Sequence, residues 1–277
     1  DMISSSHYYR EDTEEAVKEG LRLGQVLGRK LSVRTESRDT KYTRKDAGRI
    51  DKRLIAELGF GNTNVFSQTF VDTYPDAFLH ISVDASGSMG GGKWTRTMKS
   101  VVAMTKAIDM IEGVDVVVSF RSTQQSSGRG RKDNPLMLIA YDSRKDGLVK
   151  VKSLFKFLRP AGTTPEGLCY EAIMDEMVEG MNDRESYFLN FSDGMPMFGN
   201  DDVDYHYDTA LNHTEKMVKE IRNRGIKVLS YYIGDSYDSN RNMSEFKRMY
   251  GKDSQFVDVT SVTAVSRTMN KKFLEKN

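Results

Sequence analysis

The fold is decided by the stretch Phe78-Leu79-His80-Ile81-Ser82-Val83-Asp84-Ala85-Ser86-Gly87-Ser88. Its first six residues predict a buried strand that stops at Asp84. Apolar residues at helical spacing follow over 93–111, and a β-branched stretch follows over 114–120. A strand, a helix and a second strand in this order predict two parallel strands joined by a crossover helix.

The same alternation continues towards the C-terminal end. Further strands are predicted at 136–141, 186–192, 226–233 and 255–259, and further helices at 151–158, 166–177, 207–224, 244–250 and 262–274. The strand at 136–141 is expected to form a hairpin with the strand at 114–120, and the residues between them read as a loop. The pattern predicts an α/β fold of the Rossmann-like kind, with a central, mostly parallel sheet flanked by helices.

Residues 1–72 differ from the rest and are expected to form a helical and basic extension of the domain at 73–277. The spacing of apolar residues predicts a helix over 16–31. Residues 29–53 hold ten basic and four acidic residues, which favours a solvated arm. A docking surface for an acidic partner is the alternative. A short helix is predicted over 52–58, ended by Gly59 and Gly61.

Composition excludes several classes of protein. The 277 residues carry 41 Lys and Arg against 40 Asp and Glu, a net charge of +1 that does not favour a nucleic-acid binder. One cysteine excludes a disulfide framework, and no run of 18 apolar residues could span a membrane. No signal peptide is visible, although the chain begins at Asp1 rather than Met, as a fragment would. We expect a cytoplasmic protein without a membrane partner.

Oxygen-bearing side chains occur at three places: after two of the predicted strands and in one predicted loop. Asp84, Ser86 and Ser88 come directly after the first strand, and Asp193 follows the strand at 186–192. The loop before the helix at 166–177 adds Thr163 and Thr164. Ligands of open α/β sheets bind at the carboxyl ends of the strands, so we expect these groups to meet at one exposed sheet edge. Carboxylates and hydroxyls are hard ligands, which select Mg²⁺, or else Mn²⁺ or Ca²⁺, over zinc or copper.

Two other interpretations of these residues are weaker. Residues 87–93 satisfy the phosphate-loop pattern G-x-x-x-x-G-K, but Trp94 stands where that loop needs a magnesium-binding hydroxyl. Asp84 and Asp193 could also be simple turn formers. No histidine lies near Ser86 or Ser88 in sequence, so we expect no intrinsic catalysis.

At these residues the sequence resembles a von Willebrand factor A domain over about 77–274. That family carries a metal-ion-dependent adhesion site with a D-x-S-x-S motif, a threonine in a second loop and an aspartate in a third. The matching metal ligands here are Asp84, Ser86, Ser88, Thr164 (with Thr163 as the alternative) and Asp193. The resemblance implies that a Glu or Asp of a partner protein completes the shell of a Mg²⁺ ion.

A closer resemblance is to the CobT-type subunit of aerobic cobalt chelatase and to relatives encoded beside MoxR-type AAA+ ATPases. It rests on the basic run at 41–53, the stretch Pro165-Glu166-Gly167-Leu168, and the stretch Ser192-Asp193-Gly194-Met195-Pro196. It implies an adaptor subunit that binds an AAA+ ATPase and its client, without catalysis of its own. The alternatives are a cobalt chelatase subunit in cobalamin synthesis, as a non-catalytic part of an ATP-dependent metal chelatase, and a nucleic-acid-associated A-domain protein that uses the basic segment.

Overall fold

The computed structural model describes residues 2–4, 7–35, 38–72, 76–124, 133–234, 240–251 and 254–256. The chain divides into two compact units, one of Asp1–Leu31 with Asp76–Asn277 and one of Ser32–Pro75. The first unit carries the α/β fold, and the second is a small antiparallel sheet. Most of the helix that we assigned to the extension at 1–72 therefore groups with the α/β unit.

The central sheet has six strands in the order β11-β10-β7-β4-β5-β6. Their bounds are β4 (Ala77–Asp84), β5 (Val114–Gln124), β6 (Asn134–Asp142), β7 (Glu185–Ser192), β10 (Lys227–Tyr232) and β11 (Gln255–Phe256). All neighbours are parallel except β5 and β6, which form the predicted antiparallel hairpin. The predicted α/β fold with a mostly parallel sheet is confirmed.

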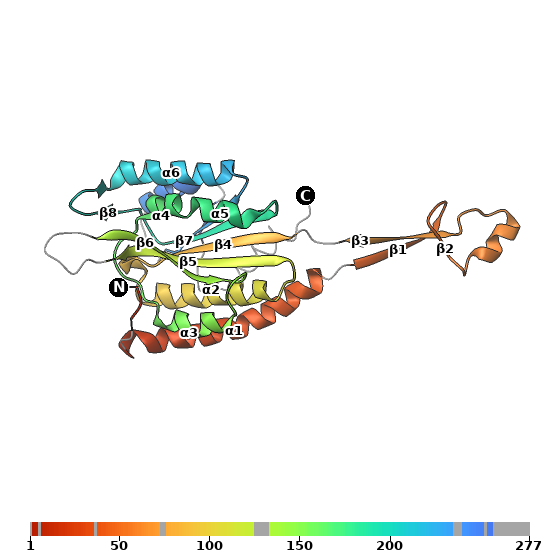
Figure 1. The fold of residues 1–277 in the computed structure, drawn as a ribbon, viewed down its shortest axis with the longest axis horizontal. Helices are drawn as coiled ribbons and strands as arrows, with labels where there is room; N and C mark the ends of the chain where they lie inside the picture. The colour runs from red at the N-terminus through yellow and green to blue at the C-terminus, as the bar shows by residue number, and fades with distance from the viewer. Residues whose placement is uncertain are drawn as a thin grey trace. The chain divides into compact units, whose positions relative to one another are not determined.

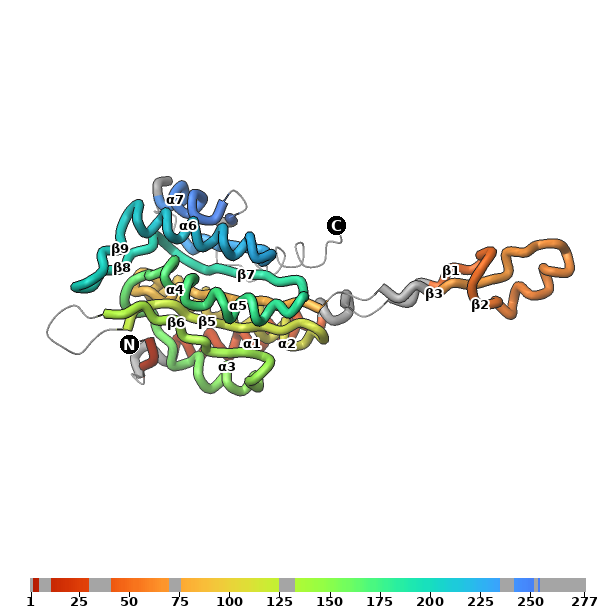
Figure 2. The backbone as a smooth tube through the Cα atoms, turned by 45° about the horizontal axis from the view of Figure 1, so that its top comes forward, coloured from red at the N-terminus to blue at the C-terminus, as the bar shows by residue number. Residues whose placement is uncertain are grey.

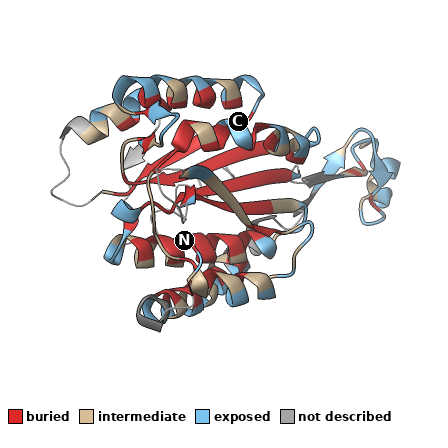
Figure 3. Ribbon diagram, turned by 60° about the vertical axis from the view of Figure 1, so that its left-hand side comes forward, coloured by how far each residue is buried: buried red, intermediate tan, exposed pale blue. Residues whose placement is uncertain are grey.

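Helices cover both faces of this sheet, as Figures 1 and 2 show. They are α1 (His7–Thr35), α2 (Gly92–Asp109), α3 (Val149–Leu154), α4 (Glu166–Ala172), α5 (Met174–Met181), α6 (Tyr207–Asn223) and α7 (Asn240–Tyr250). Side chains of α1, α2 and α3 share one apolar cluster with the sheet, and those of α4 to α7 share another. Strands β4 and β7 and most of β5 and β10 are buried between the two layers (Figure 3).

Alternate residues of β4 point to opposite layers, because side chains of a strand alternate between its faces. Leu79, Ile81 and Val83 belong to the cluster with α1 to α3. His80 lies on the other face, where its ring is 5.7 Å from that of Phe188. This alternation places Asp84, the last residue of β4, on the side of α4 to α7.

Helix α1 lies directly against α2, and three glycines at a spacing of four residues allow the close approach. A Cβ atom on Gly20 would lie 2.8 Å from the carbonyl oxygen of Lys99, and one on Gly24 would lie 2.5 Å from that of Ala103. The ion pair of Glu19 with Lys99, at 2.6 Å, joins the same two helices. The helix begins at His7, well before the predicted start, so it is longer than its apolar pattern.

The unit of residues 32–75 contains strands that were not predicted, although most residues over 41–50 are exposed, as expected of a solvated arm. Its sheet has the order β1-β3-β2, with β1 (Arg38–Lys45), β2 (Arg49–Ile50) and β3 (Phe66–Asp72) all antiparallel. The expected helix over 52–58 is a 3₁₀ helix, η1 (Ile55–Phe60), ended by Gly61 with a φ of 82°. The strands were missed because charged residues replace the apolar residues that normally reveal a strand.

Several other boundaries differ from the predictions. The helix predicted over 151–158 is α3 followed by the 3₁₀ helix η3 (Phe155–Phe157), and the helix over 166–177 is divided into α4 and α5. The two-residue strands β8 (Phe198–Gly199) and β9 (Asp204–Tyr205) were not predicted. The helix predicted over 262–274 lies outside the described residues, as does most of the loop before β6. Among the helices that the structure describes, none has the length and apolar character needed to cross a bilayer.

Candidate functional site

Three loops meet at the carboxyl edge of the central sheet. Strand β4 ends at Asp84 and continues through the 3₁₀ helix η2 (Gly87–Met89) into α2, and its neighbour β7 ends at Ser192. The third loop precedes α4 and is tied to the first, because the N–H of Gly87 donates to the carbonyl of Gly162 at 3.0 Å. Gly162 has a φ of 72°, a left-handed conformation that glycine adopts without strain.

Asp84 is the centre of this edge and is fully buried. Its Oδ1 accepts the N–H of Ser86 at 2.8 Å. Its Oδ2 accepts the hydroxyl of Ser192 at 3.1 Å and that of Thr164 at 3.4 Å. One carboxylate therefore holds groups from all three loops.

A second chain of contacts joins the remaining predicted residues. The Ser86 and Ser88 hydroxyl oxygens are 3.0 Å apart, and the Ser88 hydroxyl donates to Asp193 Oδ1 at 2.8 Å. The structure thus brings Asp84, Ser86, Ser88, Thr164 and Asp193 together. The backbone N–H of Thr163 donates to the Thr123 hydroxyl at 3.1 Å, away from Asp84. Between the two threonines left open by the sequence, Thr164 is the one that contacts Asp84.

The expectation that this edge is exposed is wrong for most of the site. Ser88 is exposed, but Asp84, Ser86, Thr164 and Asp193 are all buried. Of the five residues, only Ser88 is exposed to solvent. Buried carboxylates are costly unless hydrogen bonds or cations compensate them.

A buried ion pair lies behind the site and was not predicted. The guanidinium of Arg121, on β5, contacts the carboxylate of Glu166, at the start of α4, and both residues are fully buried. The same guanidinium donates to the Ser82 hydroxyl at 3.0 Å and to the Phe191 carbonyl at 3.2 Å. The hydroxyl of Tyr170 donates to Glu166 at 3.1 Å. No sequence signal pointed to this network, because Arg121 follows the predicted strand at 114–120 and falls in the predicted loop, whereas β5 extends to Gln124.

Both carboxyl groups of the site are harder to ionise than usual. Burial raises the pKa of Asp84, and the nearby positive charge of Arg121 opposes that rise. Burial and the negative charge of Asp84 raise the pKa of Asp193, against the hydrogen bond from Ser88 and the ammonium of Lys93. Two buried carboxylates that repel each other favour a cation between them.

The oxygen set fits the chemistry of a hard divalent cation. Octahedral Mg²⁺ with ligands at about 2.1 Å places adjacent oxygens about 3 Å apart. The distances from Ser86 to Ser88 and from Ser88 to Asp193, 3.0 and 2.8 Å, are those of hydrogen bonds and are also compatible with such an edge. In the described part of the chain, no three His, Cys, Asp or Glu side chains converge. A cation here would therefore depend on hydroxyls as well as the two carboxylates.

Two other reactive side chains are sequestered. His80 is buried, contacts the Ser119 hydroxyl at 2.8 Å, and has its pKa lowered to about 3, chiefly by burial. Cys169 is also buried, which raises the pKa of its thiol to about 12. Neither group has the character of a base or nucleophile at neutral pH.

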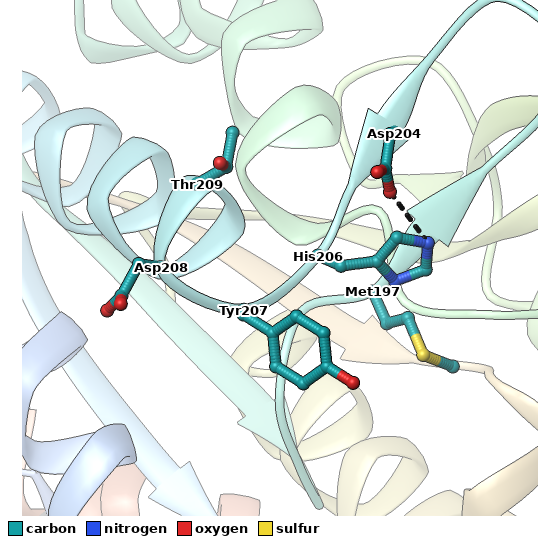
Figure 4. Close-up of a pocket in the computed structure, with 6 residues that line it drawn as sticks. All are labelled: Met197, Asp204, His206, Tyr207, Asp208 and Thr209. Carbon is teal, nitrogen blue, oxygen red and sulfur yellow. Dashed lines mark ion pairs between the residues drawn. The ribbon is translucent and has the colours of Figure 1, made fainter.

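A pocket of about 610 Å³ is lined by the segment between β7 and the first turn of α6 (Figure 4). Its six lining residues are Met197, Asp204, His206, Tyr207, Asp208 and Thr209. In Figure 4 the His206 ring pairs with Asp204 at 3.2 Å, while Asp208 points away from both. The N–H of Met197 donates to the Thr164 carbonyl at 2.8 Å, so the pocket is joined to the site through the backbone.

The chain matches no known protein-family model. It is 25% identical over 237 residues to the uncharacterized protein YojO of Bacillus subtilis (strain 168), a match that covers 83% of this chain and 35% of YojO. The chain thus spans about a third of the length of that curated relative.

Among solved structures, the chain is similar to the pilus adhesin SpaC of Lactobacillus rhamnosus GG. The open conformation has a TM-score of 0.49 at 12% identity, covering 74% of this chain and 31% of SpaC. A second crystal form has a TM-score of 0.47 at 12% identity, covering 75% of this chain and 32% of SpaC.

Proposed function

We propose that this chain is a von Willebrand factor A-type domain that recognises a partner protein through a bound divalent cation. The observation that carries the proposal is the convergence of Asp84, Ser86, Ser88, Thr164 and Asp193 from three loops at one sheet edge. These residues also stand in the order of a metal-ion-dependent adhesion site. Mg²⁺ is the proposed ion, with Mn²⁺ or Ca²⁺ as alternatives.

The charges of the site explain how a partner would be selected. Asp84 and Asp193 are the two carboxylates of the set, and its other members are neutral hydroxyls. A protein site with few charged ligands leaves a divalent cation attractive to a further carboxylate. A Glu or Asp of the partner would supply it, and the buried surroundings of Asp84 strengthen such a charged contact.

The proposed partner is an AAA+ ATPase of the MoxR or cobalt-chelatase kind, with this chain as its adaptor in the cytoplasm. Support comes from the resemblance at 41–53, 165–168 and 192–196 rather than from the geometry of the site. The adaptor role does not require this chain to catalyse a reaction. The sequestered states of His80 and Cys169 are compatible with that role.

The experiment is a binding titration of the purified chain against a MoxR-type AAA+ ATPase, with Mg²⁺ and with a chelator. We expect binding with Mg²⁺ and none with the chelator. Asp84→Asn, which keeps the volume of the side chain, should also lose binding. The matched control is Asp115→Asn, at the amino end of β5, which removes a carboxylate from the opposite edge of the sheet and should bind normally. Equal affinity with and without the chelator would falsify the cation bridge.

A further inference from the structure

Lys93 is a charged residue of the site that the ligand motif does not include. It lies at the beginning of α2, and its Nζ atom is 3.0 Å from Asp193 Oδ2. The Lys93 side chain is 15% exposed and that of Asp193 is 1% exposed. Lysine normally extends its ammonium into water, so this largely buried position at the start of α2 is a specific feature of the site.

The two oxygens of Asp193 are engaged by different groups. Oδ1 accepts the hydroxyl of Ser88, a member of the proposed ligand set, and Oδ2 accepts the ammonium of Lys93. One carboxylate therefore joins the oxygen cluster to a fixed positive charge. A cation bound by Asp193 would lie close to the Lys93 ammonium. The two positive charges would repel each other, and burial would strengthen the repulsion.

We infer that Lys93 is an internal competitor for the cation site. This inference rests on the proposed function. Without a divalent cation, the ammonium of Lys93 neutralises Asp193 and stabilises the closed cluster of loops. A divalent cation that takes Asp193 as a ligand must overcome the repulsion of that ammonium or displace it from Oδ2. Lys93 thereby weakens cation affinity and keeps the site in a stable form when no cation is bound.

The same helix offers a matched control for the charge. Lys99 also lies on α2 and pairs with a carboxylate, Glu19 of α1, at 2.6 Å. Lys99→Met removes the same charge from the same helix without changing a contact of Asp193. Lys93→Met removes the ammonium at the site and keeps most of the apolar stem.

The experiment measures the dissociation constant for Mn²⁺ by calorimetric titration of the wild-type chain and both variants. We expect Lys93→Met to bind Mn²⁺ about tenfold more tightly or better, because a unit charge beside the ion has been removed. Lys99→Met should bind like the wild type. Lys93→Gln is the second variant should Lys93→Met not fold.

A second measurement separates competition from a general effect on folding. Without a divalent cation, Lys93→Met should unfold at a lower temperature than the wild type, because buried Asp193 has lost its partner. Saturating Mn²⁺ should raise the unfolding temperature of Lys93→Met more than that of the wild type.

The outcomes distinguish the two proposals. If the wild type binds Mn²⁺ and the Lys93 variants bind it equally well or more weakly, the competitor role is overturned while the cation site stands. If none of the proteins binds Mn²⁺, the proposed function is overturned, and the competitor role is overturned with it.

Discussion

An apolar cluster packs on each side of the central sheet, but strand β4 presents different side chains to the two sides. On the face of α1 to α3, β4 contributes Leu79, Ile81 and Val83, all in one apolar cluster. On the face of α4 to α7, β4 contributes Phe78 and then His80, Ser82 and Asp84, all of them buried. We call these two sides of β4 its apolar face and its polar face. Burial of apolar surface favours folding, whereas burial of polar groups needs compensating contacts.

The two faces of β4 differ in how strictly they constrain their residues, and the candidate site lies at the end of the more constrained face. The apolar face can be packed by any residues of suitable volume. The polar face requires particular partners, such as Arg121 with Glu166, and it ends at Asp84. We therefore expect substitutions on the apolar face to change stability alone, and substitutions towards Asp84 to change cation binding.

The largest effect is expected at the buried ion pair. Arg121→Met leaves the carboxylate of Glu166 buried without its cation, which should lower the free energy of unfolding by about 3–5 kcal/mol. Urea-induced unfolding measures this. The double variant Arg121→Met with Glu166→Gln should recover part of the loss, and a double variant no more stable than the single one would count against the pairing of charges.

A large loss of stability is also expected on the apolar face, without a change at the site. Leu79→Ala removes a fully buried side chain and should lower the free energy of unfolding by about 2–5 kcal/mol. The folded variant should keep the Mn²⁺ affinity of the wild type, because its side chain points to the layer opposite Asp84. A tenfold loss of affinity in calorimetry would break the distinction between the two faces.

The third prediction concerns pH and His80. Its pKa is about 3 in the folded chain against 6.5 as the ordinary value, mainly because of burial and then the charge of Arg144. The unfolded chain therefore binds more protons between these values, so stability falls as pH drops below 6.5. Between pH 7.5 and 5 the loss should be about 2 kcal/mol.

The measurement for His80 is urea unfolding at both pH values for the wild type and for His80→Gln, which keeps a polar contact for Ser119. The variant should lose less stability on acidification. An unchanged pH dependence in His80→Gln contradicts the assignment.

The smallest effect is expected at Asn190, on β7. It is fully buried, and neither polar atom of its side chain has a hydrogen-bond partner among the described residues. Asn190→Leu has a similar volume and should raise the free energy of unfolding by about 1 kcal/mol. A shift of the urea midpoint to lower concentration would show that the amide contributes to the fold instead.

The sequence predicted those elements whose packing follows a simple period. Strand β4 and helix α2 were located to within a residue or two, because their apolar residues mark a buried strand and an amphipathic helix. Strands β1 and β3 were missed, since charged residues such as Arg38 and Asp39 obscure any apolar alternation. These strands form because distant segments pair with each other, and a local sequence pattern does not reveal such pairing.

The residues of the site could be predicted from the sequence, but their burial and their charged partners could not. Asp84, Ser86, Ser88 and Asp193 were identified because strand ends of a parallel sheet meet at one edge. The roles of Arg121 and Lys93 were not, because their partners lie 45 and 100 residues away in the chain. The burial of Asp84 also depends on how three loops pack, which no single segment specifies.

The most direct test of the account is a crystal structure of the chain grown with Mn²⁺, with anomalous scattering used to locate the ion. We expect one peak enclosed by the Ser86 and Ser88 hydroxyls and the carboxylates of Asp84 and Asp193, at ligand distances of about 2.2 Å or through single waters. No peak at this edge, with those side chains still bonded to one another under saturating Mn²⁺, would contradict the central claim.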